Sequence, residues 1–401
     1  MKETILAIDV GSSKMATIIA NFENNSIDIL GISIGKNKLS KENLAIDFEN
    51  HQDNIKDLIN DTTSNLSLNI NKTIIALSNK DIVNVKSSGK IDITDKVVTK
   101  DIINQALQMA AFNVSIAPEY EIIQVIPKNF TIDGIYINNP LNKNGKKLEV
   151  YANIFLAKKD TINKFKKLNF TNPIFVSSAY ATALAISNEE QRKNGVIILD
   201  MGTVTSQIIC FKENEYIYND SLPLGSNLIT DDLALNLDIP FDIAENLKLK
   251  VSNSLKIDID EDIDLLTVQK IINEKLEVIF TLLKRKLEKN INISDFQSGI
   301  LITGGLANLI VVKDIATDIF QNLSIVLSFP NNIENKFINL QEHNLSCCVG
   351  LVNYARFSEN KFELDSNKKI VYFNHTKNSN TITKKNKREL PTFMKKLLEH
   401  F

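Results

Sequence analysis

The sequence lacks the features that mark several large classes of protein. Its 401 residues contain no Trp and only three Cys, two of which, Cys347 and Cys348, are adjacent. Adjacent cysteines rarely bridge and an odd number leaves one over, so a disulfide framework is excluded and a reducing, cytosolic compartment is expected. Because the pair lies in an apolar segment, we expect it to serve core packing rather than redox chemistry.

Other chemistries are missing as well. The four His residues show no metal-ligand spacing, and no Gly-x-x-x-x-Gly-Lys-Ser/Thr stretch occurs. No run of 18 apolar residues is present, which predicts no membrane-spanning helix, and the first apolar run stops at Asp9, too early for a signal peptide. The formal net charge of −2 argues against a global basic field, so we predict no nucleic-acid partner.

The apolar residues that are present, 43% of the chain, suffice for two to four domains or subdomains. Their spacing predicts short strands and amphipathic helices. We expect strands within 4–36 and at 74–77, 82–93, 121–126, 148–157, 196–211 and 300–302. We expect helices at 50–70, after a Thr99 cap, at the end of 171–187, through most of 226–290 and at 345–356.

One pattern occurs twice, about half a chain apart. An apolar strand is followed by an aspartate, one apolar residue, a glycine, a small hydroxyl residue and a second strand, at 5–13 and again at 196–204. A tight glycine turn at Gly11 and Gly202 lets backbone N–H groups approach phosphate oxygens closely. Hydroxyl donors and one Lys accompany the turns: Ser12, Ser13, Lys14, Thr203 and Thr205.

The two aspartates of this repeat, Asp9 and Asp200, would repel phosphate unless a cation lay between them. Mg²⁺ held through its waters by two carboxylates satisfies that requirement. We therefore predict Asp9 and Asp200 as the catalytic and magnesium-binding residues. A single Asp-x-Gly turn is a common hairpin, so the prediction rests on the repetition.

A third glycine element, Gly304-Gly305, follows the apolar residues 300–302. Two glycines allow the backbone to lie flat against a purine or ribose. The alternative interpretation is an ordinary turn from a strand into a helix.

The order of these three elements resembles that of the actin-like ATPase superfamily, with two phosphate loops and then an adenosine loop. The resemblance implies an α/β fold in which two domains with ribonuclease H-like cores clamp ATP and Mg²⁺. It also implies ribose and base contacts from Glu245 and Lys248, which the residues alone would suggest to be an exposed i, i+3 ion pair. The predicted cofactor-binding residues are Gly11, Ser12, Ser13, Lys14, Gly202, Thr203, Thr205, Gly225, Glu245, Lys248, Gly304 and Gly305.

Residues 81–162 resemble the 1C insertion of the FtsA family of bacterial cell-division proteins. They share its sequence of turns, which comprises Pro127, Asp133-Gly134, Asn139-Pro140 and Gly145. The resemblance covers about 4–356. It implies subdomain 1A at 1–80 and 163–190, 1C at 81–162, 2A at 191–226 and 299–357, and 2B at 227–298. Where the family usually has an acidic residue before the helix at 177–180, this chain has Ile174, so we expect nucleotide binding with at most weak ATPase activity.

The C-terminal region changes character. Residues 358–388 are rich in Asn, Lys and Ser, which predicts a flexible linker. Residues 389–401 predict a basic amphipathic helix that binds an anionic membrane surface. The predicted membrane-binding residues are Phe393, Met394, Lys395, Lys396, Leu397, Leu398 and Phe401. The alternative is a terminal helix docked on its own domain.

By resemblance, the chain is expected to polymerise, to tether filaments of FtsZ to the membrane and to help recruit later division proteins. It would act at the cytoplasmic face of the inner membrane, at the division site. Subdomain 2B would bind the C-terminal peptide of FtsZ, with the charged residues 284–288 as one candidate contact and a solvated face as the alternative. Two other functions stay open: a PilM-like pilus-assembly adaptor, and a small-molecule kinase of the same superfamily.

Overall fold

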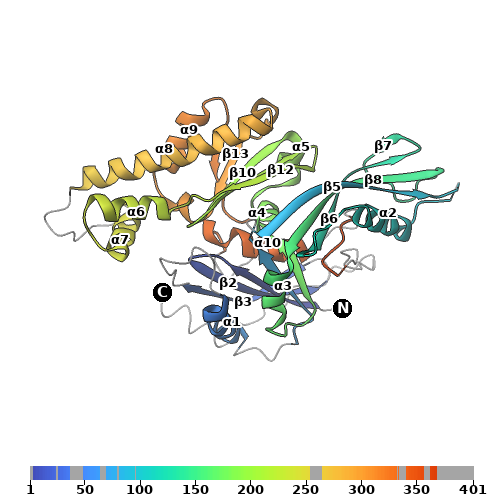
Figure 1. Ribbon diagram of the computed structural model, residues 1–401, viewed down its shortest axis with the longest axis horizontal. Helices are drawn as coiled ribbons and strands as arrows, with labels where there is room; N and C mark the ends of the chain where they lie inside the picture. The colour runs from blue at the N-terminus through green and yellow to red at the C-terminus, as the bar shows by residue number, and fades with distance from the viewer. Residues whose placement is uncertain are drawn as a thin grey trace, which may run out of the picture.

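A computed structural model of the chain describes residues 3–23, 26–36, 48–63, 69–78, 81–94, 96–252, 264–331, 333, 340–355 and 362–367 (Figure 1). They form three sheets with helices packed on and between them. Within this part of the chain, no helix has the length and apolar character needed to cross a membrane.

The first sheet has the strand order β3-β2-β1-β4-β9. Its strands are β1 (Glu3–Val10), β2 (Lys14–Glu23), β3 (Ser26–Lys36), β4 (Lys72–Leu77) and β9 (Pro173–Ser177). The first three are antiparallel neighbours, whereas β4 and β9 run parallel to β1. Helix α1 (Phe48–Thr63) turns Ile55, Leu58 and Thr62 inward, and the Thr62 hydroxyl lies 2.6 Å from that of Thr17 on β2.

The second sheet repeats this plan with the order β12-β11-β10-β13-β14. Its strands are β10 (Val196–Met201), β11 (Ser206–Lys212), β12 (Glu215–Leu222), β13 (Ile300–Thr303) and β14 (Ile325–Leu327). Again three antiparallel strands are followed by two parallel ones. Helices α5 (Glu189–Asn194) and α9 (Val312–Phe320) and the short turns η2 (Ile293–Asp295), η3 (Gly305–Asn308) and η4 (His343–Leu345) accompany it.

Three helices inserted in the second half form a separate layer: α6 (Asn227–Asn236), α7 (Phe241–Ser252) and α8 (Leu265–Asn290). Asp264 caps α8 by accepting from the N–H groups of Leu266 and Thr267. Apolar residues at helical spacing, among them Ile272, Leu276, Ile279 and Leu283, bury one face of α8. The helical interpretation of residues 226–290 is therefore confirmed for the described residues.

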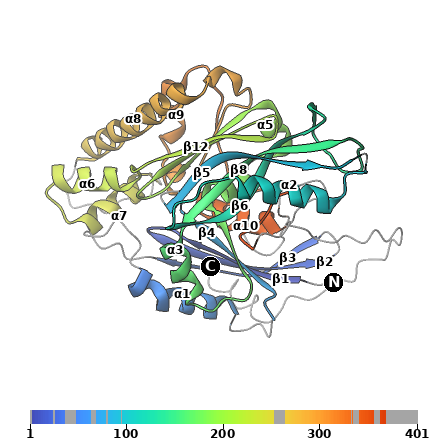
Figure 2. The ribbon, with the colours of Figure 1, turned by 45° about the vertical axis from the view of Figure 1, so that its right-hand side comes forward.

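The third sheet projects to one side of the molecule (Figures 1 and 2). It has the order β5-β8-β6-β7, with β5 (Ile82–Asp92), β6 (Tyr120–Ile132), β7 (Ile135–Ile137) and β8 (Lys147–Lys158). Helix α2 (Lys100–Phe112) covers one face, and Thr99 caps it as predicted. Helix α3 (Lys159–Lys166) leads back to the first sheet. Strand β7 was not predicted; the turn at Asp133 and Gly134, both with positive φ, closes a hairpin that creates it.

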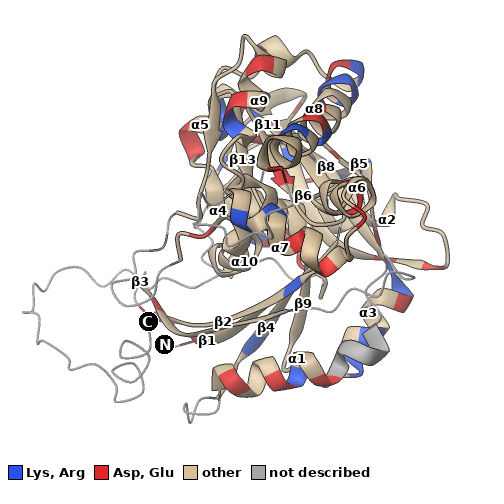
Figure 3. Cartoon of the chain, turned by 90° about the vertical axis from the view of Figure 1, so that its left-hand side faces the viewer, with Lys and Arg blue, Asp and Glu red and all other residues tan. Residues whose placement is uncertain are grey.

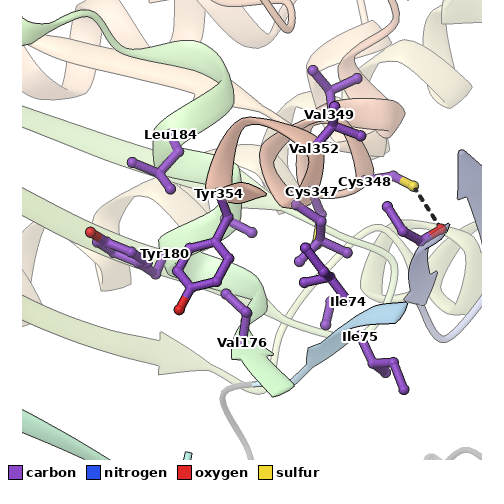
Figure 4. Close-up of a cluster of buried hydrophobic side chains, with 14 of the residues drawn as sticks. Ile74, Ile75, Val176, Tyr180, Leu184, Cys347, Cys348, Val349, Val352 and Tyr354 are labelled. Carbon is purple, nitrogen blue, oxygen red and sulfur yellow. Dashed lines mark hydrogen bonds between the residues drawn. The ribbon is translucent and has the colours of Figure 1, made fainter. Parts of the chain in front are cut away.

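Two buried helices lie between the first and second sheets. They are α4 (Ser178–Ile186) and α10 (Ser346–Ala355), and every side chain of α4 is buried (Figure 4). A Cβ atom added to Gly350 would lie 1.8 Å from the carbonyl oxygen of Ala181, so the glycine allows the two backbones to touch. Cys348 is fully buried here, with its thiol 3.6 Å from the Ala16 carbonyl oxygen, which agrees with its predicted role in the core.

One prediction is wrong. Residues 362–367, taken as part of a flexible linker, are packed against the protein, and Phe362 and Leu364 are 2% and 1% exposed. They alternate with Glu363 and Asp365, the period of a strand, but the polar composition of the surrounding sequence conceals this short pattern. Residues 368–388 of the predicted linker and the predicted membrane helix at 389–401 lie outside the described residues.

Candidate functional site

A cavity of about 340 Å³ lies where the two similar sheets face each other. Both aspartate-led hairpins, the Gly304-Gly305 element and helix α7 line it. Of the predicted site residues in the folded body, only Gly225 is absent from the lining. Gly225 lies behind the second hairpin, where an added Cβ atom would come within 2.4 Å of the Gly202 carbonyl oxygen.

The two hairpins have the same local geometry. The N–H of Gly11 donates to the Lys14 carbonyl at 2.9 Å, and the N–H of Gly202 donates to the Thr205 carbonyl at the same distance. The hairpins also meet, because the hydroxyl oxygens of Ser13 and Thr203 are 2.5 Å apart. Segments 190 residues apart in sequence therefore form one wall of small hydroxyl groups and backbone N–H groups.

Asp9 and Asp200 both line the cavity. Removal from water raises the pKa of Asp9 to about 6; a hydrogen bond from the Cys347 thiol and the charge of Lys14 oppose this, whereas Asp200 adds to it. Burial also raises the pKa of Asp200, against a hydrogen bond of 2.9 Å donated by the Thr182 hydroxyl. Two enclosed carboxylates that repel each other favour a cation between them.

These carboxylate and hydroxyl oxygens are the donors that Mg²⁺ prefers. The described residues contain no group of three or more His, Cys, Asp or Glu side chains that would enclose a metal ion. The donor set thus fits a magnesium ion that keeps most of its waters and bridges to phosphate, and it does not fit an all-protein metal cage.

Gly304 closes the cavity beside Asp200. Its φ is +88°, and an added Cβ atom would lie 2.6 Å from both the Asp200 Oδ1 atom and the Met201 carbonyl oxygen. At Gly305 the corresponding space is empty. Only the first glycine is therefore required by the protein itself.

The pair Glu245 and Lys248 lies on α7 with both residues lining the cavity. The Lys248 side chain is 2% exposed, and its Nζ donates to Glu245 Oε2 at 2.6 Å and to the Thr230 hydroxyl at 2.9 Å. Burial lowers the pKa of Lys248, and the charge of Glu245 opposes this. The alternative of an exposed ion pair is therefore wrong for Lys248.

Sequence reasoning missed several residues of the site. Those that line the cavity or hold an aspartate are Ser178, Thr182, Gln207, His343, Ser346 and Cys347. Thr182 carried a signal, because it is a polar residue within the otherwise apolar stretch 179–186. Cys347 was assigned to core packing alone, but it faces the cavity.

Comparison with protein families identifies two segments. A model described as the SHS2 domain inserted in FtsA matches residues 79–156, and a model of the cell division protein FtsA matches residues 197–350. Together they take in more than half of the chain.

Curated relatives named cell division protein FtsA match most of the chain. The protein of Helicobacter pylori strain J99 is 27% identical, over 92% of this chain and 85% of its own length. That of Borreliella burgdorferi is 25% identical, over 90% of this chain and 92% of its own length.

Solved structures agree in fold. A PilM–PilN type IV pilus biogenesis complex superposes with a TM-score of 0.62 at 15% identity, covering 86% of this chain and 97% of the other. MreB5 of Spiroplasma citri bound to ADP gives 0.52 at 12% identity, covering 88% and 96%. The predicted actin-like α/β fold with an FtsA-type insertion is confirmed. On the two family matches and the FtsA relatives together, the chain belongs to the FtsA family of actin-like bacterial cell-division proteins.

Proposed function

We propose that the chain binds ATP with Mg²⁺ in the cavity between the two sheets. The observation that carries this proposal is the contact of the two hairpins at Ser13 and Thr203, directly beside the enclosed pair Asp9 and Asp200. The backbone N–H groups and hydroxyls at 11–14 and 202–205 would bind the phosphates. Asp9 and Asp200 would hold Mg²⁺ through water, and the ion would neutralise phosphate charge.

The ribose and base would lie toward α7 and the third glycine element. Glu245 offers a carboxylate that is one-third exposed, and its bond from Lys248 keeps it in place. Gly304 and Gly305 leave the backbone accessible beside Leu306 and Leu309. MreB5 of Spiroplasma citri, of the same fold, is described with ADP and with AMPPNP, which supports an adenine nucleotide here.

We propose that turnover is slow. Of the additional polar side chains of the cavity, Ser178 and Gln207 are neutral and poor acceptors for a proton from water. The ring of His343 is stacked on Phe329, with its Nδ1 atom 2.8 Å from the Ser328 carbonyl oxygen. Ile174 is buried in β9 and does not line the cavity. ATP would then act mainly as a ligand that holds the two halves together.

Thermal unfolding of the full chain with and without Mg·ATP tests the binding site. A ligand at 100 times its Kd adds about 2.7 kcal/mol to stability, so the midpoint should rise with ATP. Lys14→Met should remove most of the rise, because the Lys14 charge faces the phosphate site. Lys128→Met, which breaks a partly exposed pair with Glu215 outside the cavity, is the matched control and should leave the rise intact. An equal rise in both variants, or none in the native chain, rejects the proposal.

We further propose the cellular role that the family suggests: a filament-forming adaptor that tethers FtsZ to the inner membrane at the division site and helps recruit later division proteins. The subdomain boundaries given above belong to this proposal. The FtsZ peptide would bind the helical layer of α6, α7 and α8. Helix α8 carries residues of both charges (Figure 3). Within residues 284–288, Lys284 binds the Ile319 carbonyl and pairs with Glu288, and Lys286 pairs with Asp220, so the exposed Arg285 is the better candidate.

The membrane tether would be the basic amphipathic sequence 389–401. So short a helix gains little as a single copy, so a filament should bind far more tightly than a monomer through avidity. Co-sedimentation with anionic vesicles tests it. Phe393→Asp with Leu397→Asp should abolish binding, whereas Thr392→Ala, on the polar arc, should not. Unchanged sedimentation of the double variant excludes the tether.

A further inference from the structure

Residues 362–367, here called the strap, pair with the third sheet. Val125 on β6 and Leu364 exchange two backbone hydrogen bonds, each of 3.0 Å. Among the described strands, β7 is the neighbour of β6 on this side and pairs only with residues 130–132, so the strap pairs where no named strand lies. Phe362 and Leu364 belong to the core of that sheet, and the rings of Phe362 and Phe130 meet edge to face at 6.1 Å.

The other end of the strap binds the first sheet. The Ser366 hydroxyl accepts from the N–H of Phe175 at 3.2 Å, and the Asn367 amide donates to the Pro173 carbonyl at 3.4 Å. Both partners are on β9, the edge strand of that sheet. The strap therefore lies in a groove between two strand edges that belong to different sheets.

The strap also contacts the helix behind the cavity. The Tyr180 hydroxyl donates to Glu363 Oε1 at 2.5 Å, in the interior. Tyr180 packs against the rings of Tyr216 and Tyr354 at centroid distances of 5.9 and 6.5 Å. Figure 4 shows Tyr180 beside Tyr354. It is a residue of α4, two positions from Ser178 in the cavity wall and two from Thr182, which holds Asp200.

We propose that the groove between β6 and β9 is a docking site for an extended peptide of alternating apolar and acidic residues, and that its occupant is this chain's own strap. Docking fixes the inserted third sheet against the first sheet and fixes α4 beneath the cavity. The core of the insertion thus depends on Phe362 and Leu364, more than 200 residues after the segment 79–156 that matches the insertion family. The strap leads directly into the C-terminal tail, so it links the tail to both sheets.

Hydrogen exchange on the full chain tests the docking, because the amides of Val125 and Phe175 have their acceptors in the strap. In Phe362→Ala with Leu364→Ala, peptides covering 123–127 and 173–177 should exchange about tenfold faster or more. The control, Leu309→Ala with Phe320→Ala, removes similar side chains from the core of the second sheet. It should not speed exchange in these two peptides more than in the rest of the chain. Equal protection in the strap variant, or equal loss in the control, overturns the proposal.

A peptide with the sequence of residues 362–367 tests the groove in trans. At millimolar concentration it should restore protection at Val125 and Phe175 in the strap variant, whereas a peptide of the same composition in scrambled order should not. Restoration by neither peptide, or by both, contradicts a docking site specific for the alternating pattern.

The link to α4 is tested by Tyr180→Phe, with Tyr218→Phe as the matched control, since Tyr218 also donates to a carboxylate, that of Asp220, at 2.8 Å. Only Tyr180→Phe should speed exchange in residues 178–186 of the protein without nucleotide, and it should lower Mg·ATP affinity by about threefold. The affinity measurement rests on the proposed function, but the exchange measurement does not. If the native chain bound no ATP, exchange alone would decide the link, and unchanged exchange in Tyr180→Phe would reject it.

Discussion

The two halves of the molecule have the same strand order, yet their aspartates have different neighbours. Asp9 has Lys14 and the Cys347 thiol beside it. Asp200 has the Thr182 hydroxyl and the backbone of Gly304. The position equivalent to Lys14 in the second hairpin is Thr205, which carries no charge. The backbone geometry is thus duplicated while the electrostatics are not, and of the two hairpins the first carries a positive charge, on Lys14, where the second carries none.

The two halves should therefore tolerate different amino-acid substitutions. The first half supplies the lysine charge, whereas the second half supplies more of the space: a Cβ atom added to Gly225 or Gly304 would come as close as 2.4 or 2.6 Å to backbone or Asp200, against 2.8 Å at Gly11. Substitutions that fill space should therefore be most damaging in the second half. Substitutions that remove charge should act in both halves, through the shared carboxylate pair.

The largest effect is expected from Gly304→Ala. The left-handed φ and the clash with Asp200 Oδ1 should cost about 1–3 kcal/mol of stability and displace the carboxylate. ATP affinity should fall about 100-fold, which corresponds to about 2.7 kcal/mol. Gly305→Ala, which meets open space, should leave the unfolding temperature of the nucleotide-free protein unchanged. Calorimetric unfolding and ATP titration measure both, and equal unfolding temperatures for the two variants would contradict the role of Gly304.

Asp9→Asn and Asp200→Asn should each raise the stability of the nucleotide-free protein and lower its affinity for ATP. Each removes one of two enclosed carboxylates whose pKa values are raised, so the nucleotide-free protein should unfold a few degrees higher at neutral pH. Magnesium-dependent ATP affinity should fall about 10–100-fold, since the ion loses one of its water-bridged partners. Thermal unfolding and ATP titration on the same preparations check both signs. Stability and affinity moving in the same direction would indicate a purely structural role.

A smaller effect is expected from Thr182→Val, which keeps the shape but removes the hydrogen bond to Asp200. A net loss of about 1 kcal/mol predicts an affinity lower by about fivefold, with little change in stability. Thr317→Val, which removes a bond from an exposed threonine to the Lys313 carbonyl, is the matched control. Equal affinities for the two variants would show that Asp200 needs no such positioning.

The sequence predicted the parts of the site whose geometry is local. Each hairpin is contained in about ten consecutive residues, so its aspartate, glycine and hydroxyls can be identified without knowing the fold. Thr182 and Cys347 could not be assigned in this way. Their approach to the aspartates depends on the crossing of α4 and α10 at Ala181 and Gly350, a contact between segments 169 positions apart.

The strap was missed for a related reason. Phe362 and Leu364 form too short an apolar pattern to stand out in an Asn- and Lys-rich region, and their partners on β6 lie more than 200 residues earlier. For Lys248, the sequence predicted a local pairing but not the burial of the side chain. Its i, i+3 pairing with Glu245 was predicted, but its burial follows from Thr230 and Ser226, on and beside α6.

Isothermal titration calorimetry of the full chain with ATP, once in excess Mg²⁺ and once in excess EDTA, tests most directly whether the two hairpins hold one magnesium nucleotide between them. The account predicts one ATP per chain in Mg²⁺ and an affinity at least about tenfold lower in EDTA, with Asp200→Asn binding equally weakly in both. Equal affinity of the native chain with and without Mg²⁺, or no binding in either, would contradict it.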